Sequence, residues 1–170
     1  MKKVPIRILV VILPFLFLFQ SCGIYSLAGA STEGMKTVSV DFFENAAPIV
    51  VPTLSQAFTE ELKTRIRTQS KLNIIRDNAD GHFEGRITDY NIGNVAVTAN
   101  ERSSLVRLTI TVSVKYTSAV KPENSFEQSF SQSEQFSLDQ GSVQQQEPKI
   151  IPIITRRLTE DIFNKAFANW

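Results

Sequence analysis

Cysteine and histidine, which often supply nucleophiles or metal ligands, each occur once in the 170-residue chain, as Cys22 and His82. Cys22 follows a small residue, Ser21, at the end of an apolar run. Exported proteins usually pair their cysteines, so a single one has three interpretations: a buried free thiol, an intermolecular disulfide or a lipidated cysteine. Its position favours lipidation, which would anchor the chain in a membrane through several acyl chains.

The first 21 residues have the pattern of an export signal. Three basic residues precede an apolar run at residues 8–19, which is broken only by Pro14. The run is shorter than the roughly 20 apolar residues that a membrane-spanning helix needs, so residues 1–21 are predicted to be a removable signal peptide. The junction departs from the usual lipoprotein pattern, because Phe19 and Gln20 replace a leucine and a small residue.

His82 alone indicates little catalytic chemistry. One histidine cannot form a His-based metal cluster, and its place between Gly81 and Phe83 is typical of a strand-edge residue rather than of a general base. The sequence contains no glycine-rich phosphate loop, nucleophile elbow or HExxH motif. The scattered carboxylates leave a catalytic acidic pair open, but no second feature supports one. We therefore expect no enzymatic activity, no cofactor and no metal.

Four basic residues on the predicted long strands, or on the tip that connects them, are candidates for binding an anionic group. They are Arg86, Arg102, Arg107 and Lys115. Arginine matches the geometry of phosphate well; the alternative is that each residue simply belongs to a solvated polar face. Four other arginines are predicted to lie solvated on helices: Arg65, Arg67, Arg156 and Arg157.

Charge argues against one class of partner. Without residues 1–21 the chain would keep 15 basic side chains against 17 acidic ones, a formal charge of −2. A general nucleic-acid binder would show a basic excess, so nucleic acid is not an expected partner.

Hydrophobic periodicity predicts the elements that position these residues. One face of a first helix is marked by apolar residues four apart, with Ala57 beside them: Leu54, Phe58, Leu62 and Ile66. A capping box of Thr53 and Gln56 is predicted to begin this helix, which ends near Ser70. Strands are predicted over residues 36–43 and 72–76, and a long strand over 82–97 is expected to be irregular around residues 89–94.

The segment 107–116 is the clearest predicted strand, because apolar and polar residues alternate strictly along it. A last strand is predicted over residues 126–136, followed by a loose connection rich in Gln and Ser over 138–146. A second helix is predicted from Pro148 or Pro152 to the C-terminus. Its apolar stripe comprises Ile151, Ile154, Leu158, Ile162 and Ala166, widened by Phe163, Phe167 and Trp170.

This order of elements predicts an α+β fold, with two helices packed on one face of a mostly antiparallel sheet of about four strands. The chain divides into a lipoprotein signal peptide at residues 1–21, a flexible tether at 22–34 and a single α+β domain at 35–170.

Five stretches now resemble a known family. They are Cys22-Gly-Ile-Tyr-Ser-Leu-Ala-Gly-Ala, residues 54–69 with the following Ser-Lys-Leu, Phe83-Glu-Gly-Arg-Ile-Thr-Asp-Tyr, Arg107-Leu-Thr-Ile-Thr-Val, and Glu160-Asp-Ile-Phe-Asn-Lys-Ala-Phe-Ala-Asn-Trp. In this order the set resembles the LptE family of lipopolysaccharide-assembly lipoproteins in its Bacteroidetes form, over nearly all of the chain after the signal peptide.

The resemblance implies a lipoprotein anchored in the outer membrane on its periplasmic side. Such a protein plugs a large β-barrel translocon, helps to deliver lipopolysaccharide to the cell surface and binds lipopolysaccharide. No short motif carries the family's binding residues, so the four basic candidates come from strand alternation alone. Two other classes stay open: an accessory or pilot lipoprotein of another envelope transport complex, and a periplasm-facing enzyme.

Overall fold

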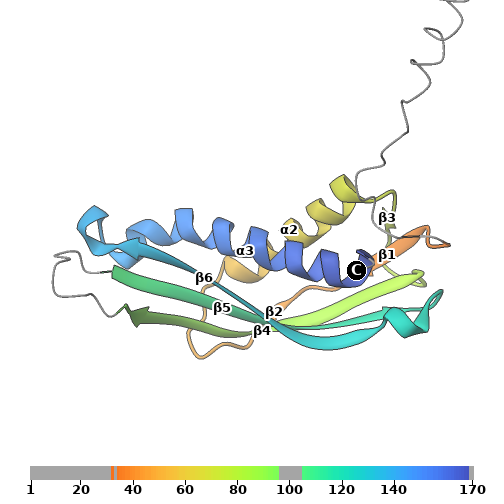
Figure 1. Cartoon of the computed structure of the whole chain (residues 1–170), viewed down its shortest axis with the longest axis horizontal. Helices are drawn as coiled ribbons and strands as arrows, with labels where there is room; N and C mark the ends of the chain where they lie inside the picture. Colours follow the sequence, from red (N-terminus) through yellow and green to blue (C-terminus); the bar gives the residue numbers. More distant parts are fainter. Residues whose placement is uncertain (1–31, 33, 96–104, 169–170) are drawn as a thin grey trace, which may run out of the picture.

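The computed structural model describes residues 32, 34–95 and 105–168, in which two helices cover one face of a sheet (Figure 1). The helices are α2 (Leu54–Gln69) and α3 (Val143–Phe167), and the long strands are β4 (Gly81–Asn94), β5 (Leu105–Ser118) and β6 (Phe126–Ser137). The short elements are β1 (Thr37–Val40), β2 (Glu44–Asn45), β3 (Asn73–Ile74) and the 3₁₀ turns η1 (Pro122–Asn124) and η2 (Leu138–Gln140). The predicted signal peptide and most of the predicted tether lie outside the described residues.

The sheet has six strands and is mixed, which corrects the expectation of about four mostly antiparallel strands. Its order is β3-β1-β4-β5-β6, and β2 also pairs with β4. The three long strands pair antiparallel, whereas β1 pairs parallel with β3 and β4, and β2 pairs parallel with β4. The β1–β3 pair is parallel because α2 forms the crossover between them, as a parallel connection requires. The predicted strands at 36–43 and 72–76 contain β1 and β3, whereas the two-residue β2 was not predicted and strand periodicity does not reveal the parallel pairing.

The predicted alternation of β5 is confirmed. Its apolar residues Leu108, Ile110, Val112 and Val114 are fully buried, while the residues between them are exposed or half-buried. β4 contains a bulge between its paired residues Ile87 and Asp89, close to the predicted irregularity at residues 89–94. A bulge adds one residue and so changes which residues of the strand face inward.

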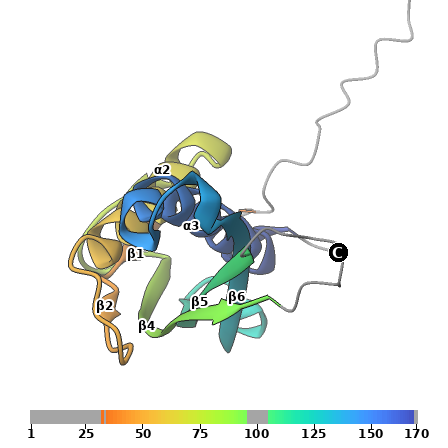
Figure 2. The same cartoon turned by 90° about the vertical axis from the view of Figure 1, so that its left-hand side faces the viewer.

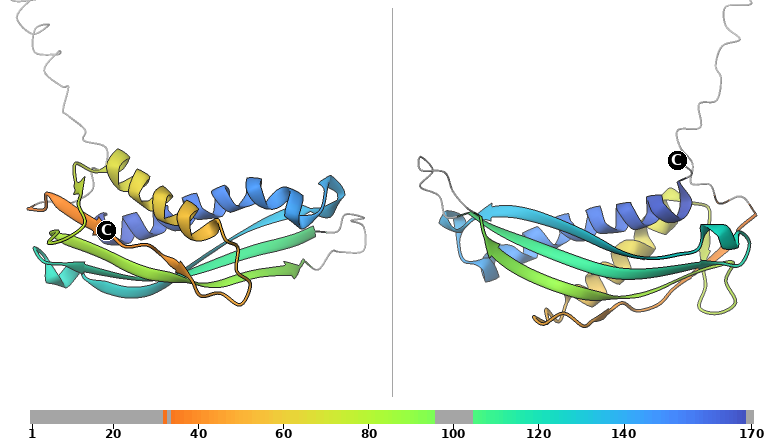
Figure 3. Two further views of the ribbon diagram at one scale, coloured as in Figure 1. Left: turned by 180° about the vertical axis from the view of Figure 1, so that it is seen from behind. Right: turned by 60° about the horizontal axis from the view of Figure 1, so that its bottom comes forward.

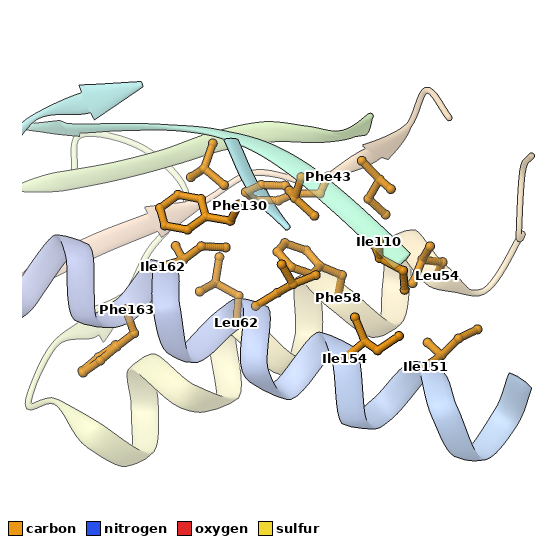
Figure 4. Packing of buried hydrophobic residues seen from close by; sticks show 14 of the residues in the cluster. Phe43, Leu54, Phe58, Leu62, Ile110, Phe130, Ile151, Ile154, Ile162 and Phe163 are labelled. Atoms are coloured by element: carbon orange, nitrogen blue, oxygen red, sulfur yellow. The ribbon is translucent and has the colours of Figure 1, made fainter. Parts of the chain in front are cut away.

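The core lies between the helices and the covered face of the sheet, as the end view in Figure 2 and the close-up in Figure 4 show. The described residues of both predicted stripes are buried there, except that Ala57 is exposed; Trp170 lies outside the described residues. Three rings from three elements contact one another: Phe83 and Tyr116 have ring centroids 4.5 Å apart, and Phe167 lies 5.8 and 5.7 Å from them. Burying a large apolar side chain contributes about 1.5–3 kcal/mol, so these rings hold the end of α3 firmly on β4 and β5.

The ends of the helices differ from the sequence prediction. Thr53 precedes α2 without a side-chain capping bond, so the predicted capping box does not form. α3 begins at Val143, several residues before either predicted proline, and Pro148 and Pro152 lie inside it. A capping box forms here instead, because Ser142 and Gln145 satisfy each other's backbone amides. Neither helix in the described part of the chain is long and apolar enough to cross a membrane.

The Gln-rich segment before the second helix is therefore ordered rather than a loose connection. Gln146 is buried, and its side-chain amide donates to the carbonyls of Ser137 at 2.9 Å and Gly141 at 2.7 Å. These bonds fix the first turn of α3 against the end of β6. Glutamine thus serves as a local hydrogen-bonding residue here, which composition alone does not distinguish from a linker.

One helix arginine is not solvated as predicted. Arg65 is only 8% exposed, because it lies against Arg156 and Thr159 of α3. Arg67, Arg156 and Arg157 are exposed, as expected.

Candidate binding face of the sheet

The face of the sheet that the helices leave uncovered is polar along its length, and the second view in Figure 3 shows β4, β5 and β6 running across it. Strand alternation and register determine which side chains lie on it. We call this set the open face; it comprises His82, Glu84, Arg86, Asp89 and Asn91 of β4, Arg107, Thr109, Thr111, Ser113 and Lys115 of β5, and Glu127, Ser129, Ser131, Ser133 and Gln135 of β6. Its arginine and lysine residues are matched in number by its carboxylates, so anion binding depends on which cations are unpaired.

A first hollow of about 370 Å³ lies over the first half of β4 and the second half of β5. It brings together two of the predicted binding residues, Arg86 and Lys115, with Glu84 and Glu127. Gly85 also lines it. Only glycine fits at this position, because a Cβ would lie 2.2 Å from the Ser113 carbonyl and 2.6 Å from the ring of Phe43. Gly85 alternates with Glu84 and Arg86, so this Cβ would point to the covered face, where Phe43 is buried.

Lys115 and Arg86 differ in availability. Lys115 Nζ lies 2.6 Å from Glu84 Oε1, and this hydrogen bond lowers the pKa of Glu84 and raises the pKa of Lys115. Arg86 is exposed and forms no ion pair with any described residue. An incoming anion would meet a free guanidinium at Arg86 but would compete with a carboxylate at Lys115.

A second hollow of about 420 Å³ lies at the far end of the same strands. Arg107 and Thr109 of β5 line it together with Asn91 and Asn94 of β4. Arg107 is exposed and, within the described part of the chain, has no carboxylate partner. This hollow thus offers one free guanidinium among side-chain amides and a hydroxyl.

The structure therefore separates the predicted binding residues into two places. Arg86 and Lys115 share the first hollow, and Arg107 lies in the second, eight positions from Lys115 and so roughly 27 Å away at the usual rise of a strand. Arg102 and Cys22 lie outside the described residues. Sequence reasoning missed Glu84 and Glu127 as counter-charges, although Glu84 alternates with Arg86 on one strand; pairing with Lys115 depends on the β4–β5 register.

His82 is the second residue of β4, close to the end of that strand, and β4 is flanked by β1 and β5. Its Nδ1 lies 2.6 Å from Ser39 Oγ, and its Nε2 lies 3.3 Å from Asp41 Oδ2. The order Ser–His–Asp resembles the relay of a hydrolase. Ser39, however, is only 3% exposed, so a substrate carbonyl cannot reach its hydroxyl and the arrangement is not a nucleophilic site.

Comparison with known proteins adds a family and a fold. A family model described as LptE, lipopolysaccharide-assembly, matches residues 35–166. A search of curated protein sequences found no match.

Solved structures from several bacteria share the fold at low sequence identity. A minor lipoprotein from Acinetobacter baumannii is 15% identical with a TM-score of 0.50, over 77% of this chain and 91% of that one. The protein CT253 from Chlamydia trachomatis is 13% identical with a TM-score of 0.53, over 75% of this chain and 93% of that one. A putative neuraminyllactose-binding hemagglutinin homolog from Helicobacter pylori is 10% identical with a TM-score of 0.53, over 79% of this chain and 87% of that one. At these identities the likeness concerns the fold alone.

Proposed function

The chain belongs to the LptE family of lipopolysaccharide-assembly proteins, and on this basis we propose that it is an outer-membrane lipoprotein that pairs with a large β-barrel translocon and binds lipopolysaccharide through the open face. The general role in lipopolysaccharide assembly, without enzymatic activity, follows from the family. The pairing with a β-barrel, the location in the outer membrane and the binding of lipopolysaccharide by the open face are what we propose beyond the family role.

The family match carries the proposal, because it covers residues 35–166 and therefore nearly the whole described domain. A domain that assists transport without catalysis must act by binding. The open face is the surface suited to this, since among the described residues no helix covers it and two of its cations, Arg86 and Arg107, have no carboxylate partner. Guanidinium groups bind phosphate through paired hydrogen bonds.

The spacing of the two arginines suits an extended anionic ligand. Arg86 is paired in register with Ser113, six positions from Arg107, which is roughly 20 Å along the strand. The two side chains therefore cannot hold one phosphate, but each can contact a different part of a large head group. Lys115 and Arg102 are the remaining proposed contacts, and Lys115 would have to exchange Glu84 for the ligand.

The proposed anchor is Cys22, exposed as the new N-terminus when residues 1–21 are removed. Residues 22–34 would then tether the domain at residues 35–170. Gly23 at the next position, instead of aspartate, and the lack of a following acidic cluster favour the periplasmic leaflet of the outer membrane.

The test is to reverse both free arginines in the full-length protein, as Arg86→Glu with Arg107→Glu. Charge-assisted hydrogen bonds to phosphate contribute about 1.5–3 kcal/mol each, so lipopolysaccharide affinity should fall at least about tenfold. The matched control is Arg67→Glu with Arg156→Glu, which makes the same charge change on exposed helix residues and should alter affinity much less. Equal losses in the two variants would indicate general charge attraction instead of a binding face.

Copurification of the barrel, measured on the same variants, separates ligand binding from partner binding. We expect the Arg86/Arg107 variant to keep the barrel and lose lipopolysaccharide. Loss of the barrel with unchanged lipopolysaccharide affinity would assign this face to the partner and refute it as the ligand site.

A further inference from the structure

We propose that Asp41, His82 and Glu84 form a binding site for a divalent transition-metal ion, with Zn²⁺ as the ion best suited to them. One ligand atom from each residue lies within 4.8 Å of the other two. All three residues are accessible, with Asp41 exposed and the other two half-buried. The site does not rest on the proposed role in lipopolysaccharide binding.

Strand pairing brings the three side chains together. β1 and β4 run parallel with Ser39 opposite His82, and the Asp41 amide donates to the Phe83 carbonyl at 2.9 Å. This bond continues the strand pairing one residue beyond β1 and holds Asp41 beside β4. His82 and Glu84 are two positions apart on β4 and therefore point to the same face. The sequence hides the cluster, because Asp41 is far from the other two along the chain.

The shortest spacing in the cluster fits a shared ion. His82 Nε2 and Asp41 Oδ2 are 3.3 Å apart. Zinc binds nitrogen and oxygen ligands at about 2.0–2.2 Å in tetrahedral geometry, which separates two neighbouring ligand atoms by roughly 3.3 Å. Glu84 needs only a side-chain rotation to complete a three-residue set, and water can occupy the fourth position. One imidazole with two carboxylates is a mixed donor set that suits zinc better than magnesium or calcium.

Ser39 supports this arrangement from behind the histidine. Its Oγ lies 2.6 Å from His82 Nδ1 and 3.5 Å from the Gly81 carbonyl. When the Ser39 hydroxyl points to that carbonyl, it accepts a hydrogen bond from Nδ1–H and leaves the Nε2 lone pair facing the carboxylates. A metal-bound histidine commonly has such a partner on its other nitrogen. Ser39 is nearly inaccessible to water, so it is a positioning residue that fixes the ring.

The positive charge of Lys115 should weaken binding of a metal ion at this site, so replacing Lys115 tests the proposal. Its ammonium lies 2.6 Å from Glu84 Oε1, where it occupies one of the two oxygens and repels a cation. Replacing it with methionine removes the positive charge but retains an unbranched apolar side chain. Metal affinity should therefore rise in Lys115→Met, whereas a histidine that merely pairs with Asp41 would give no such gain.

The experiment titrates ZnCl₂ into the purified, tag-free full-length protein by calorimetry. We expect one Zn²⁺ per chain, with binding lost in His82→Ala and at least tenfold weaker in Asp41→Asn and Glu84→Gln. Ser39→Ala should weaken binding about 10–100-fold, as the loss of an outer-shell partner usually does. Asp89→Asn, which removes a carboxylate on the same face outside the cluster, should bind like the wild type.

Thermal unfolding with and without Zn²⁺ provides a second measurement on the same proteins. The ion should raise the unfolding temperature of the wild type and Asp89→Asn, but not of His82→Ala. Wild-type protein that binds no zinc, or binding that His82→Ala leaves unchanged, would overturn the site and leave only the Ser39–His82 hydrogen bond and the contact between His82 and Asp41.

Discussion

Arg65 of α2 donates from Nε to Thr159 Oγ1 of α3 at 3.1 Å, although both residues lie inside the interface of the two helices. Its guanidinium also donates to the Arg156 carbonyl at 2.9 Å and lies 3.7 Å from Glu160. Burying a charged group is costly unless hydrogen bonds replace its water. These contacts supply that replacement, so Arg65 connects the helices at a point where an apolar residue would be expected.

Arg65→Ala should lower the free energy of unfolding by about 1–3 kcal/mol, because it removes buried packing and two hydrogen bonds. Glu160→Ala should change it by less than about 1 kcal/mol, because the Glu160 side chain is 57% exposed and its ion pair is long. Chemical denaturation of both variants measures the difference. Equal effects would show that the ion pair, rather than the buried hydrogen bonds, stabilises the contact.

Core substitutions should separate the two faces of the sheet. Leu62→Ala and Ile110→Ala each remove a fully buried side chain and should destabilise the protein by about 2–5 kcal/mol. Thr109→Ala and Thr111→Ala, on the open face, should lower the free energy of unfolding much less. Similar losses in denaturant midpoints for both pairs would contradict an uncovered open face.

Asp80 should make the free energy of unfolding depend on pH in the acidic range. Its Oδ2 accepts hydrogen bonds from the Lys36 and Thr37 amides, at 2.7 and 2.9 Å, and from the Thr37 hydroxyl. These bonds, the Lys36 amide foremost, lower the pKa of Asp80 in the folded protein. The stabilisation is thus complete above the pKa of an unfolded aspartate, about 3.9, and is lost as the pH falls through the lowered pKa.

Asp80→Asn should consequently lower the free energy of unfolding at pH 7, with a difference from wild type that shrinks below about pH 4. Urea denaturation at several pH values gives this difference directly. Asp77→Asn, an exposed aspartate in the same turn, serves as the control and should follow the wild type. If the free energy of unfolding of Asp80→Asn were lower than that of the wild type by the same amount at every pH, the loss would come from altered packing and not from the charge of Asp80.

Cys22→Ala should abolish acylation and processing by the lipoprotein pathway, because the acyl chains attach to the cysteine sulfur and its new amino terminus. Labelling cells with a radioactive or alkyne fatty acid detects the modification. Undiminished label on the variant would exclude Cys22 as the acceptor. On intact cells the wild-type protein should resist added protease, since the proposed orientation faces the periplasm.

Periodicity predicted the elements whose residues repeat over several turns or pleats. β5 and both helix faces belong to this class, because each buries one side along at least ten residues. The start of α3 differs from its prediction for another reason: Pro148 and Pro152 both indicate a helix boundary, whereas the capping pair Ser142 and Gln145 lies in a segment that composition assigns to a linker. The capping box of Ser142 and Gln145 can be found in the sequence, but it indicates a helix start less strongly than the two prolines do.

The candidate sites were less predictable than the fold, because they depend on register between strands. Arg86 and Lys115 share a hollow only because β4 and β5 pair antiparallel with Glu84 opposite Lys115. In the same way, Asp41 meets His82 through a parallel pairing of a four-residue strand, which alternation cannot reveal. Sequence could list the charged residues of one face, but not which of them neutralise one another.

The most direct test of the assigned role is to isolate the full-length lipoprotein from envelopes in mild detergent and identify what accompanies it. We expect a large outer-membrane β-barrel in near-equal amount, together with lipopolysaccharide, and we expect the barrel also to accompany the Arg86→Glu/Arg107→Glu variant. Recovery with the components of a different envelope transporter, or without any β-barrel, would contradict the proposed role in lipopolysaccharide assembly.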